Sequence, residues 1–255
     1  MDWLDERRFA LNGLIFHCCD VHQFCDVFPE DDHVILKPPA MIQRFINNIG
    51  KQKFKNVLEL GIFRGGSTIW LNELLNPAKL VAIDLTAKPV EDLENYRLES
   101  GRTEQLVTYY GTDQKDERML RQICDIDFKN ESLDLIIDDA SHYLSETSAS
   151  FNFLFPRLAP GGLYVIEDWA WSHLLADLSE ADAREAKRHF LDKEPLAPLS
   201  CYIVLATAGA RDMIDGVYVD CCSTYVRRGS GRSTARFDVA KFNRFHDGSR
   251  LSLAP

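Results

Sequence analysis

The fold of this chain is decided by the stretch Val57-Leu58-Glu59-Leu60-Gly61-Ile62-Phe63-Arg64-Gly65-Gly66-Ser67. An apolar run of strand length ends there at a glycine-containing turn, and we expect a helix to begin directly after the turn. Glycines allow a ligand to approach the backbone closely, and the first turn of a helix offers amide groups that lack intrahelical partners. The stretch therefore predicts a strand and a helix joined by a turn that is able to bind a ligand.

The same alternation of strand and helix continues along the chain. Apolar strands that are joined by helical crossovers form a mostly parallel sheet, and helices cover both faces of such a sheet. We therefore predict an α/β fold of the Rossmann-like, doubly wound kind, with a mostly parallel sheet of seven strands. The expected strands are 56–61, 80–85, 106–110, 133–139, 162–168, 216–221 and 223–228, and the expected helices are 65–76, 90–99, 114–124, 145–158, 178–192 and 197–208.

The first 50 residues are interpreted as an N-terminal helical extension. Aromatic and apolar side chains recur through them, and Lys37-Pro38-Pro39 interrupts the pattern before a final helix at about 39–48. The predicted partition is therefore an extension at 1–50 and a main domain at 51–255.

An acidic residue at the end of the second strand indicates which ligand the turn binds. Asp84 follows Gly61 by 23 residues, where a carboxylate is able to accept both hydroxyl groups of a ribose. Phe63 stands where a dinucleotide-binding turn needs its second glycine, and Glu59 would repel phosphates. The pattern favours a nucleoside cofactor with a cationic amino acid end. The alternative is a tight turn followed by an incidental acid.

Two further strands end in carboxylates, and these ends are 28 residues apart, counted from Asp139 to Glu167. If the two strands are neighbours in a parallel sheet, Asp139, Glu167 and Asp168 meet at one edge, with His142 beside them. Oxygen ligands at that density suit a hard divalent cation, and a histidine next to such a cation is able to accept a proton. The alternative is that Asp138 or Asp139 caps a helix and that His142 is an ordinary loop residue.

Composition excludes several classes of function. The chain has 255 residues and a formal net charge of −10, which disfavours nonspecific binding of nucleic acids and of anionic membranes. No apolar run approaches membrane-spanning length, and no signal peptide is recognised at the N-terminus. Seven cysteines, two adjacent pairs among them and no CxxC motif, are typical of reduced thiols. We therefore expect a cytoplasmic protein.

On these residues the sequence resembles the class I S-adenosylmethionine-dependent methyltransferases. The resemblance implies that Glu59 and Gly61 flank the methionine part of the cofactor and that Asp84 holds the ribose. Gly111-Thr112-Asp113 falls where the family contacts adenine, and Gly65-Gly66-Ser67 matches a subgroup of the family. The predicted cofactor-binding residues are Glu59, Gly61, Phe63, Gly65, Ser67, Asp84, Thr112, Asp113 and Asp138, of which Asp138 faces either the cofactor or the interior.

The acidic strand ends are similar to those of the macrolide-sugar O-methyltransferases and the cephalosporin-hydroxylase-type methyltransferases. This resemblance implies that Asp139, Glu167 and Asp168 bind Mg2+ and that His142 is the general base. Catechol O-methyltransferases have a lysine at the position of His142 and an asparagine at that of Asp168, so the sugar group is favoured. The implied activity is metal-dependent methyl transfer to a hydroxyl of a small molecule, with the N-terminal extension and the segment after Glu167 forming the acceptor pocket and lid.

Several alternatives stay open at this stage. The acceptor is a sugar on a glycosylated natural product or polysaccharide in the leading hypothesis, and a polyketide or catechol-like phenol in the second. A nitrogen methyltransferase without a catalytic metal, a cofactor-binding partner subunit and a dehydrogenase are further hypotheses. Neither nucleic acid nor membrane is an expected partner, and a homo-oligomer is left open.

Overall fold

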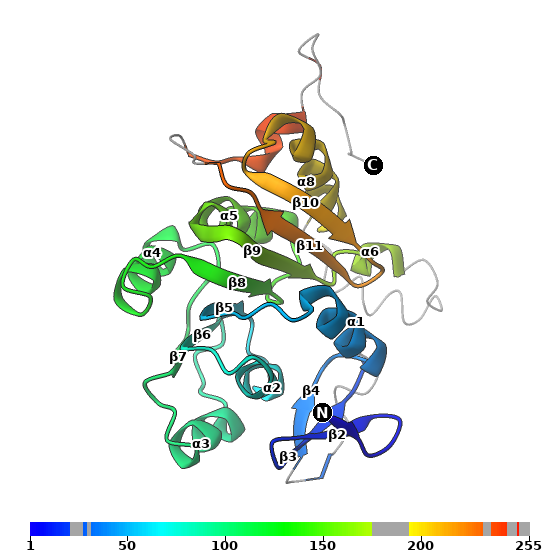
Figure 1. The fold of residues 1–255 in the computed structure, drawn as a ribbon, viewed down its shortest axis with the longest axis vertical. Coiled ribbons are helices and arrows are strands. Elements are labelled where there is room, and N and C mark those ends of the chain that lie inside the picture. The colour runs from blue at the N-terminus through cyan, green and yellow to red at the C-terminus, as the bar shows by residue number, and fades with distance from the viewer. Residues whose placement is uncertain (21–27, 30–31, 175–193, 232–235, 244–248, 250–255) are drawn as a thin grey trace. The chain divides into compact units, whose positions relative to one another are not determined.

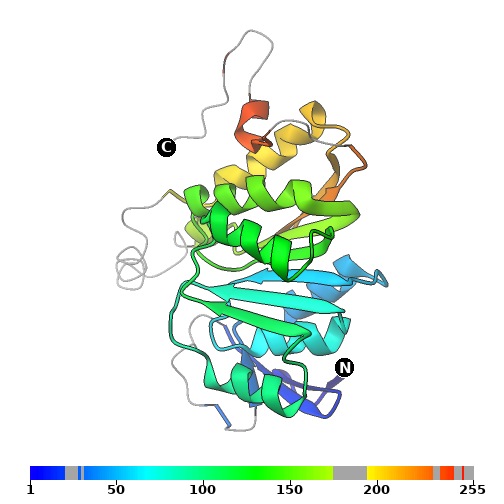
Figure 2. The same ribbon diagram turned by 90° about the vertical axis from the view of Figure 1, so that its left-hand side faces the viewer.

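The computed structural model describes residues 1–20, 28–29, 32–174, 194–231, 236–243 and 249 (Figures 1 and 2). The chain divides into two compact units, Met1–Thr112 and Asp113–Pro255. The main sheet has seven strands and is mostly parallel, as predicted. Each unit is described by itself below, and the predicted boundary at residue 50 stays a prediction.

In the first unit, three parallel strands carry the glycine turn and Asp84. Their order is β5-β6-β7, and the helices α2 and α3 follow β5 and β6 along the chain (Figure 1). Every residue of β5 is buried, including the polar residues Asn56 and Glu59. The bounds are β5 (Asn56–Leu60), α2 (Gly66–Leu75), β6 (Lys79–Asp84), α3 (Glu91–Glu99) and β7 (Leu106–Tyr110).

The prediction of a helical N-terminal extension is wrong for the described residues before residue 36, which are 1–20, 28–29 and 32–35. The described residues there form a separate four-stranded sheet in the order β1-β2-β3-β4. The helix predicted at about 39–48 is present as α1 (Pro39–Ile49). β1 to β3 pair in antiparallel fashion, whereas β4 is parallel to β3. The bounds are β1 (Asp2–Trp3), β2 (Arg8–Leu11), β3 (Leu14–Cys18) and β4 (Asp32–Ile35).

The physical reason for this correction is a hairpin signal at Asn12-Gly13. Both residues have positive φ, 52° and 87°, and Leu11 pairs with Leu14 across them. A two-residue turn of this kind matches the right-handed twist of the two strands, and Asn-Gly is the sequence that adopts it most readily. Stacking of the Phe9 and Phe16 rings, with centroids 5.1 Å apart, then holds β2 and β3 together.

The start of α2 packs directly against the backbone of β4. A Cβ atom built on Gly66 would lie 2.1 Å from the carbonyl oxygen of Val34, and one on Gly65 would lie 2.7 Å from Cβ of Leu93. Real Cβ atoms do not approach other heavy atoms this closely. Both positions therefore require glycine for packing, in addition to any role in ligand binding.

Replacing Gly66 by alanine should lower the free energy of unfolding by about 1–3 kcal/mol, because β4 or α2 must shift to admit the methyl group. Urea unfolding measures the effect. Gly216→Ala is the matched control, since no atom lies within 4 Å of a Cβ at Gly216 and its φ is not positive. Equal urea midpoints for the two variants would contradict the close approach of β4 to α2.

In the second unit, four strands have the order β10-β11-β9-β8 (Figure 1). β8 and β9 are parallel, and β11 is antiparallel to both of its neighbours. Helix α5 packs against α4 and α8. The bounds are α4 (Glu117–Ile126), β8 (Leu133–Asp138), α5 (Leu144–Leu154), β9 (Leu158–Glu167), α6 (Trp171–Leu174), α8 (Ala197–Gly209), β10 (Ile214–Val219) and β11 (Ser223–Arg228).

An apolar stripe on the helix after β8 faces the core. Phe151, Leu154 and Phe155 have no exposed surface, and a turn of 3-10 helix at Phe155–Arg157 ends the helix before β9 begins. The predicted helix at 178–192 lies outside the described residues. Within the residues that the structure describes, no helix has both the length and the apolar character needed to cross a membrane.

Candidate active site

In the first unit, Asp84 fastens the glycine turn at the end of β5. Its Oδ2 accepts hydrogen bonds from the amide groups of Ile62 and Phe63 at 2.8 and 3.1 Å, and its Oδ1 accepts one from Thr86 at 2.7 Å. The amide of Gly61 donates to the carbonyl oxygen of Ile83, so the turn lies beside the end of β6. The predicted ribose-binding carboxylate therefore also holds the predicted cofactor turn in shape.

Phe63 occupies a backbone conformation that usually belongs to glycine. Its φ is 51°, and its side chain is 47% exposed. A bulky residue in the left-handed region costs of order 1–3 kcal/mol, and such strain concentrates at functional sites. The two hydrogen bonds from the turn to Asp84 stabilise this conformation. Phe63 stands at the position where a dinucleotide-binding turn has its second glycine. Its backbone nevertheless adopts a positive φ, as a glycine would.

The other predicted cofactor residues of the first unit lie near this turn in the chain. Glu59 is fully buried within β5, and Gly65 and Ser67 lie at the start of α2. The amide of Thr112 donates to the carbonyl oxygen of Asp84 at 2.8 Å, which brings the end of β7 to the end of β6. Their contacts with a cofactor stay a prediction.

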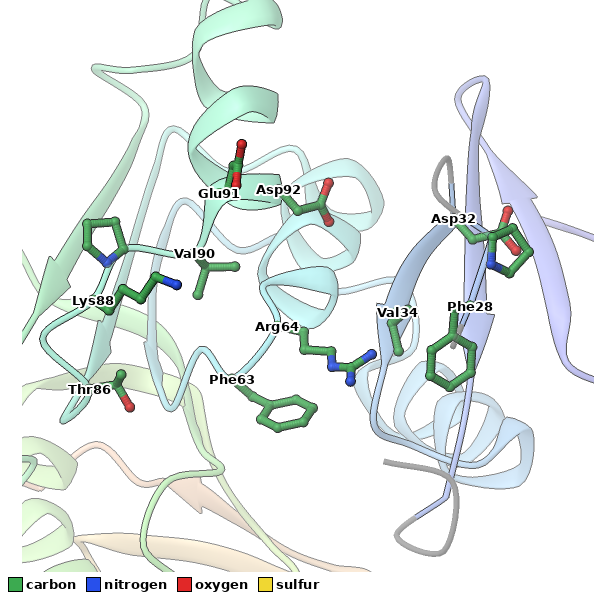
Figure 3. A pocket seen from close by; sticks show the side chains of 12 residues that line it. Phe28, Asp32, Val34, Phe63, Arg64, Thr86, Lys88, Val90, Glu91 and Asp92 are labelled. Atoms are coloured by element: carbon green, nitrogen blue, oxygen red, sulfur yellow. The ribbon is translucent and has the colours of Figure 1, made fainter. Parts of the chain in front are cut away.

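A pocket of about 620 Å³ opens beside the turn (Figure 3). The guanidinium of Arg64 lies 5.5 Å from the ring centroid of Phe28 and 5.8 Å from that of Phe63, and Figure 3 shows it between the two rings. Residues from β4 and from the start of α3 complete the wall. The lining residues are Phe28, Pro29, Asp32, Val34, Phe63, Arg64, Thr86, Lys88, Pro89, Val90, Glu91 and Asp92.

The wall of this pocket combines flat apolar surfaces with charges of both signs. An ion pair between Nδ1 of His33 and Asp92, at 2.9 Å, ties β4 to α3 across it. Pockets of this size with an apolar lining and a few polar groups suit a drug-sized organic ligand. Residues of β4 therefore line part of this pocket, and the predicted role of the N-terminal residues in an acceptor pocket stays a prediction.

In the second unit, Asp139, His142 and Asp168 converge. Nε2 of His142 lies 3.8 Å from Oδ1 of Asp139 and 4.0 Å from Oδ2 of Asp168, and one ligand atom of each residue lies within 4.8 Å of the other two. All three side chains reach solvent in part. Two carboxylates around a shared centre are the oxygen donors that Mg2+ prefers, so this donor set fits the predicted metal.

The backbone is strained at two of these three residues. His142 has a φ of 56° and Asp168 a φ of 52°. Hydrogen bonds with other segments stabilise both conformations. Nε1 of Trp171 donates to the carbonyl oxygen of His142 at 2.7 Å, and the amide of Asp168 donates to the carbonyl oxygen of Cys222 at 2.8 Å. Strain that is maintained by surrounding contacts is typical of functional sites.

Beneath this cluster, Asp138 faces the interior, which is one of the two placements that the sequence left open. Its carboxylate is 2% exposed and accepts hydrogen bonds from Tyr164 at 2.7 Å, Ser150 at 2.7 Å and Gln114 at 3.0 Å. Oε1 of Gln114 accepts the amide of Ser141 at 2.9 Å, next to His142. A buried polar network therefore positions the loop that carries the predicted base.

Sequence reasoning missed Gln114, Ser150 and Tyr164. Gln114 begins a predicted helix, and Ser150 and Tyr164 lie inside a predicted helix and a predicted strand. A polar residue at such a position is the signal that could have pointed to a buried hydrogen-bond network. Trp169 and Trp171, which follow the acidic pair in the sequence, use their indole N–H groups to bind the carbonyl oxygens of Asp220 and His142.

The network predicts how stability depends on pH. Burial raises the pKa of Asp138 from 3.8 to about 6. The hydrogen bonds that the carboxylate accepts lower the pKa and offset part of this effect. Because the folded-state pKa is the higher one, this carboxyl favours the folded state below about pH 4, and the contribution is lost as the pH rises through about 6. The unfolding free energy of the wild type, minus that of Asp138→Asn, should fall by about 2 kcal/mol from about pH 4 to about pH 7, since the unfolded carboxyl is already partly ionised at pH 4. Urea unfolding of metal-free protein checks this, and a difference that grows with pH would contradict it.

The remaining predicted residues are placed differently. Glu167 is 2% exposed at the end of β9 and is not one of the three described residues whose ligand atoms converge. Asp113 accepts the amide of Lys115 at 2.9 Å, in the loop before α4. The metal-binding role of Glu167 and the cofactor roles of Asp113 and Asp138 stay predictions.

Parts of the chain are similar to known methyltransferases. A family model described as a methyltransferase domain matches residues 58–169. Demethylmacrocin O-methyltransferase from Streptomyces fradiae is 32% identical over 119 residues, which are 44% of this chain and 27% of that protein. Mycinamicin VI 2''-O-methyltransferase from Micromonospora griseorubida is 29% identical over 136 residues, which are 51% of this chain and 31% of that protein.

A solved structure shows the same fold. The MycE methyltransferase from the mycinamycin biosynthetic pathway, in complex with Mg and SAH, has a TM-score of 0.53 and 22% identity, covering 76% of this chain and 48% of that chain. The chain thus spans less than a third of the length of the two curated relatives and about half that of the solved structure. Over residues 58–169 the chain is similar to a methyltransferase domain, and parts of it are similar to the two natural-product O-methyltransferases named above.

Proposed function

We propose that this protein is a metal-dependent S-adenosylmethionine O-methyltransferase whose acceptor is a sugar hydroxyl of a glycosylated natural product. The observation that carries the proposal is the convergence of Asp139, His142 and Asp168 on a strained backbone. Both O-methyltransferases named above as relatives support the reaction type, and their names point to antibiotic scaffolds as acceptors.

The cofactor belongs at the turn after β5. When bound, S-adenosylmethionine supplies an electrophilic methyl group, and Mg2+ supplies polarisation of an acceptor hydroxyl. The acid Asp84 and the amides of the turn would hold the nucleoside, while Glu59 in β5 lies where the family contacts the methionine end. The hydrogen bonds of the turn to Asp84 keep it in one conformation before the cofactor arrives.

Asp139 and Asp168 would hold the metal, and His142 would accept the proton. A hydroxyl is a weak nucleophile near neutral pH, so removal of its proton is required, and the histidine side chain as a class changes charge near neutral pH. Methyl transfer is an in-line displacement, and positioning of the reacting groups supplies much of its acceleration. The hydrogen bonds that Gln114 and Trp171 make with the loop containing His142 would contribute to this positioning.

The pocket of the first unit would bind an organic group other than the ribose of the cofactor. Asp84, the residue expected to hold the ribose, is not among its lining residues. The rings of Phe28 and Phe63 offer flat apolar surfaces of the kind that pack against a sugar ring or a polyketide, and the charged residues around them would orient its polar groups (Figure 3).

The test is a methyl-transfer assay of the full chain over macrolides with intact sugars, the matching aglycones and catechols, each with Mg2+ and with EDTA. We expect methylation of a sugar hydroxyl in the presence of Mg2+ alone. Turnover of catechols and aglycones but not of sugars would overturn the acceptor class. Binding of S-adenosylmethionine without methylation of any acceptor would instead identify a cofactor-binding partner subunit.

A further inference from the structure

The hairpin between β10 and β11 carries a second cluster of metal-ligating side chains, which the methyltransferase site does not use. Its members are the consecutive residues Asp220, Cys221 and Cys222, and one ligand atom of each lies within 4.8 Å of the others. Cys221 is exposed and Cys222 is partly so. We propose that these three residues form a binding site for a thiophilic divalent cation such as Zn2+.

The spacing of the two sulfur atoms fits a shared metal ion. Sγ of Cys221 lies 3.5 Å from Sγ of Cys222. Two sulfur ligands at about 2.3 Å from Zn2+ in a tetrahedral arrangement lie about 3.8 Å apart, so little movement is needed to bind the ion. Thiolates select soft and borderline cations, whereas the carboxylates at Asp139 and Asp168 suit hard ones.

The same spacing does not favour a disulfide. Adjacent residues joined by a trans peptide have Cα atoms about 3.8 Å apart, whereas the Cα atoms of a disulfide are usually at least about 4.4 Å apart. Shared coordination of a cation places no such requirement on the Cα separation. The geometry therefore points to a chelating pair and not to a bridge.

Asp220 supplies the third ligand and the rigidity of the site. Its Oδ1 accepts the amides of Cys222 and Ser223, both at 2.8 Å, and its amide donates to the carbonyl oxygen of Ser223. Its Oδ2 is inaccessible to solvent and, among the described residues, receives no hydrogen bond. A buried carboxylate oxygen without a donor is unfavourable, and a cation would satisfy it.

The hairpin is also held from its other side. The carbonyl oxygen of Asp220 accepts Nε1 of Trp169, and that of Cys222 accepts the amide of Asp168, both at 2.8 Å. The three ligands are therefore preorganised by backbone contacts and need no folding of the loop on binding. Coordination converts each thiol to a thiolate with release of a proton to solvent, so the apparent affinity should rise with pH.

The test uses the full chain, stripped of metals and then saturated with Mg2+, and titrates it with Cd2+ as the thiophilic probe. We expect one equivalent to produce the ultraviolet charge-transfer absorption of thiolate coordination. The double variant Cys221→Ser with Cys222→Ser should lose this absorption, and Asp220→Asn, whose side-chain oxygen still accepts the turn amides, should bind at least about tenfold more weakly.

Cys201→Ser is the matched control, because Cys201 is exposed on α8 in the same unit and should not alter the titration. Absence of the absorption in the wild type would overturn the proposal, and so would its persistence in the double serine variant. Methyl transfer plays no part in this readout, so its outcome is independent of the proposed function.

Discussion

Replacement of His142 by alanine should lower turnover by about 100- to 10,000-fold, the usual contribution of a general base, and leave S-adenosylmethionine affinity unchanged. The reason is the position of Nε2, which lies 3.8 and 4.0 Å from the two carboxylates proposed to hold the metal. No residue of the cofactor turn belongs to this loop. Steady-state kinetics at saturating cofactor, together with calorimetric titration of S-adenosylmethionine, measure the two effects separately.

The backbone at His142 calls for a second variant. Its φ of 56° suits asparagine far better than alanine, so His142→Asn removes the base while keeping the loop conformation. Turnover of His142→Asn near the wild-type rate would remove His142 from the base role, whatever the alanine variant does.

Asp139→Asn and Asp168→Asn should each raise the Mg2+ concentration for half-maximal turnover by at least about tenfold, because each removes an anionic oxygen donor from the cluster. Asparagine at residue 168 also tolerates the φ of 52°, so the loop is preserved. Mg2+ titration of the turnover rate, after treatment with EDTA, provides the measurement.

Asp125→Asn is the control for these two variants, because Asp125 is an exposed aspartate on α4 in the same unit. Its Mg2+ dependence should match that of the wild type. If activity survives EDTA and is insensitive to substitution at Asp139 and Asp168, the metal is not catalytic, and methyl transfer without a metal becomes the better account.

Local sequence patterns predicted most elements of the methyltransferase domain to within a few residues. The clearest case is the helix after β8, where Phe151, Leu154 and Phe155 share one face and are fully buried. The strand ends at Asp84 and Asp139 were located equally well. These patterns suffice because helix and strand periodicity depend on neighbours in the chain, and burial of one face follows from them.

The first 35 residues show where such reasoning fails. Apolar and aromatic residues were read as helical, and the short hairpin at Asn12-Gly13 was overlooked, although its turn chemistry favours positive φ at both residues. The parallel pairing of β4 with β3 is beyond local inference, since it joins residues 15–18 to residues 32–35. Gly65 was predicted to bind the cofactor, whereas the close approach of α3 to Gly65 and of β4 to Gly66 cannot be seen in the sequence.

By itself, the sequence determined the alternation of strands and helices, the glycine turn and the presence of carboxylates at particular strand ends. Only the tertiary structure decided which of those carboxylates meet. It turned Asp138 into the core, buried Glu167, and brought Asp168 to Asp139 and His142. The physical reason is that two hydrogen bonds maintain the left-handed backbone at His142 and Asp168. Trp171 donates one to the carbonyl oxygen of His142, and the amide of Asp168 donates the other to the carbonyl oxygen of Cys222. The second bond joins residues more than 50 positions apart in the chain.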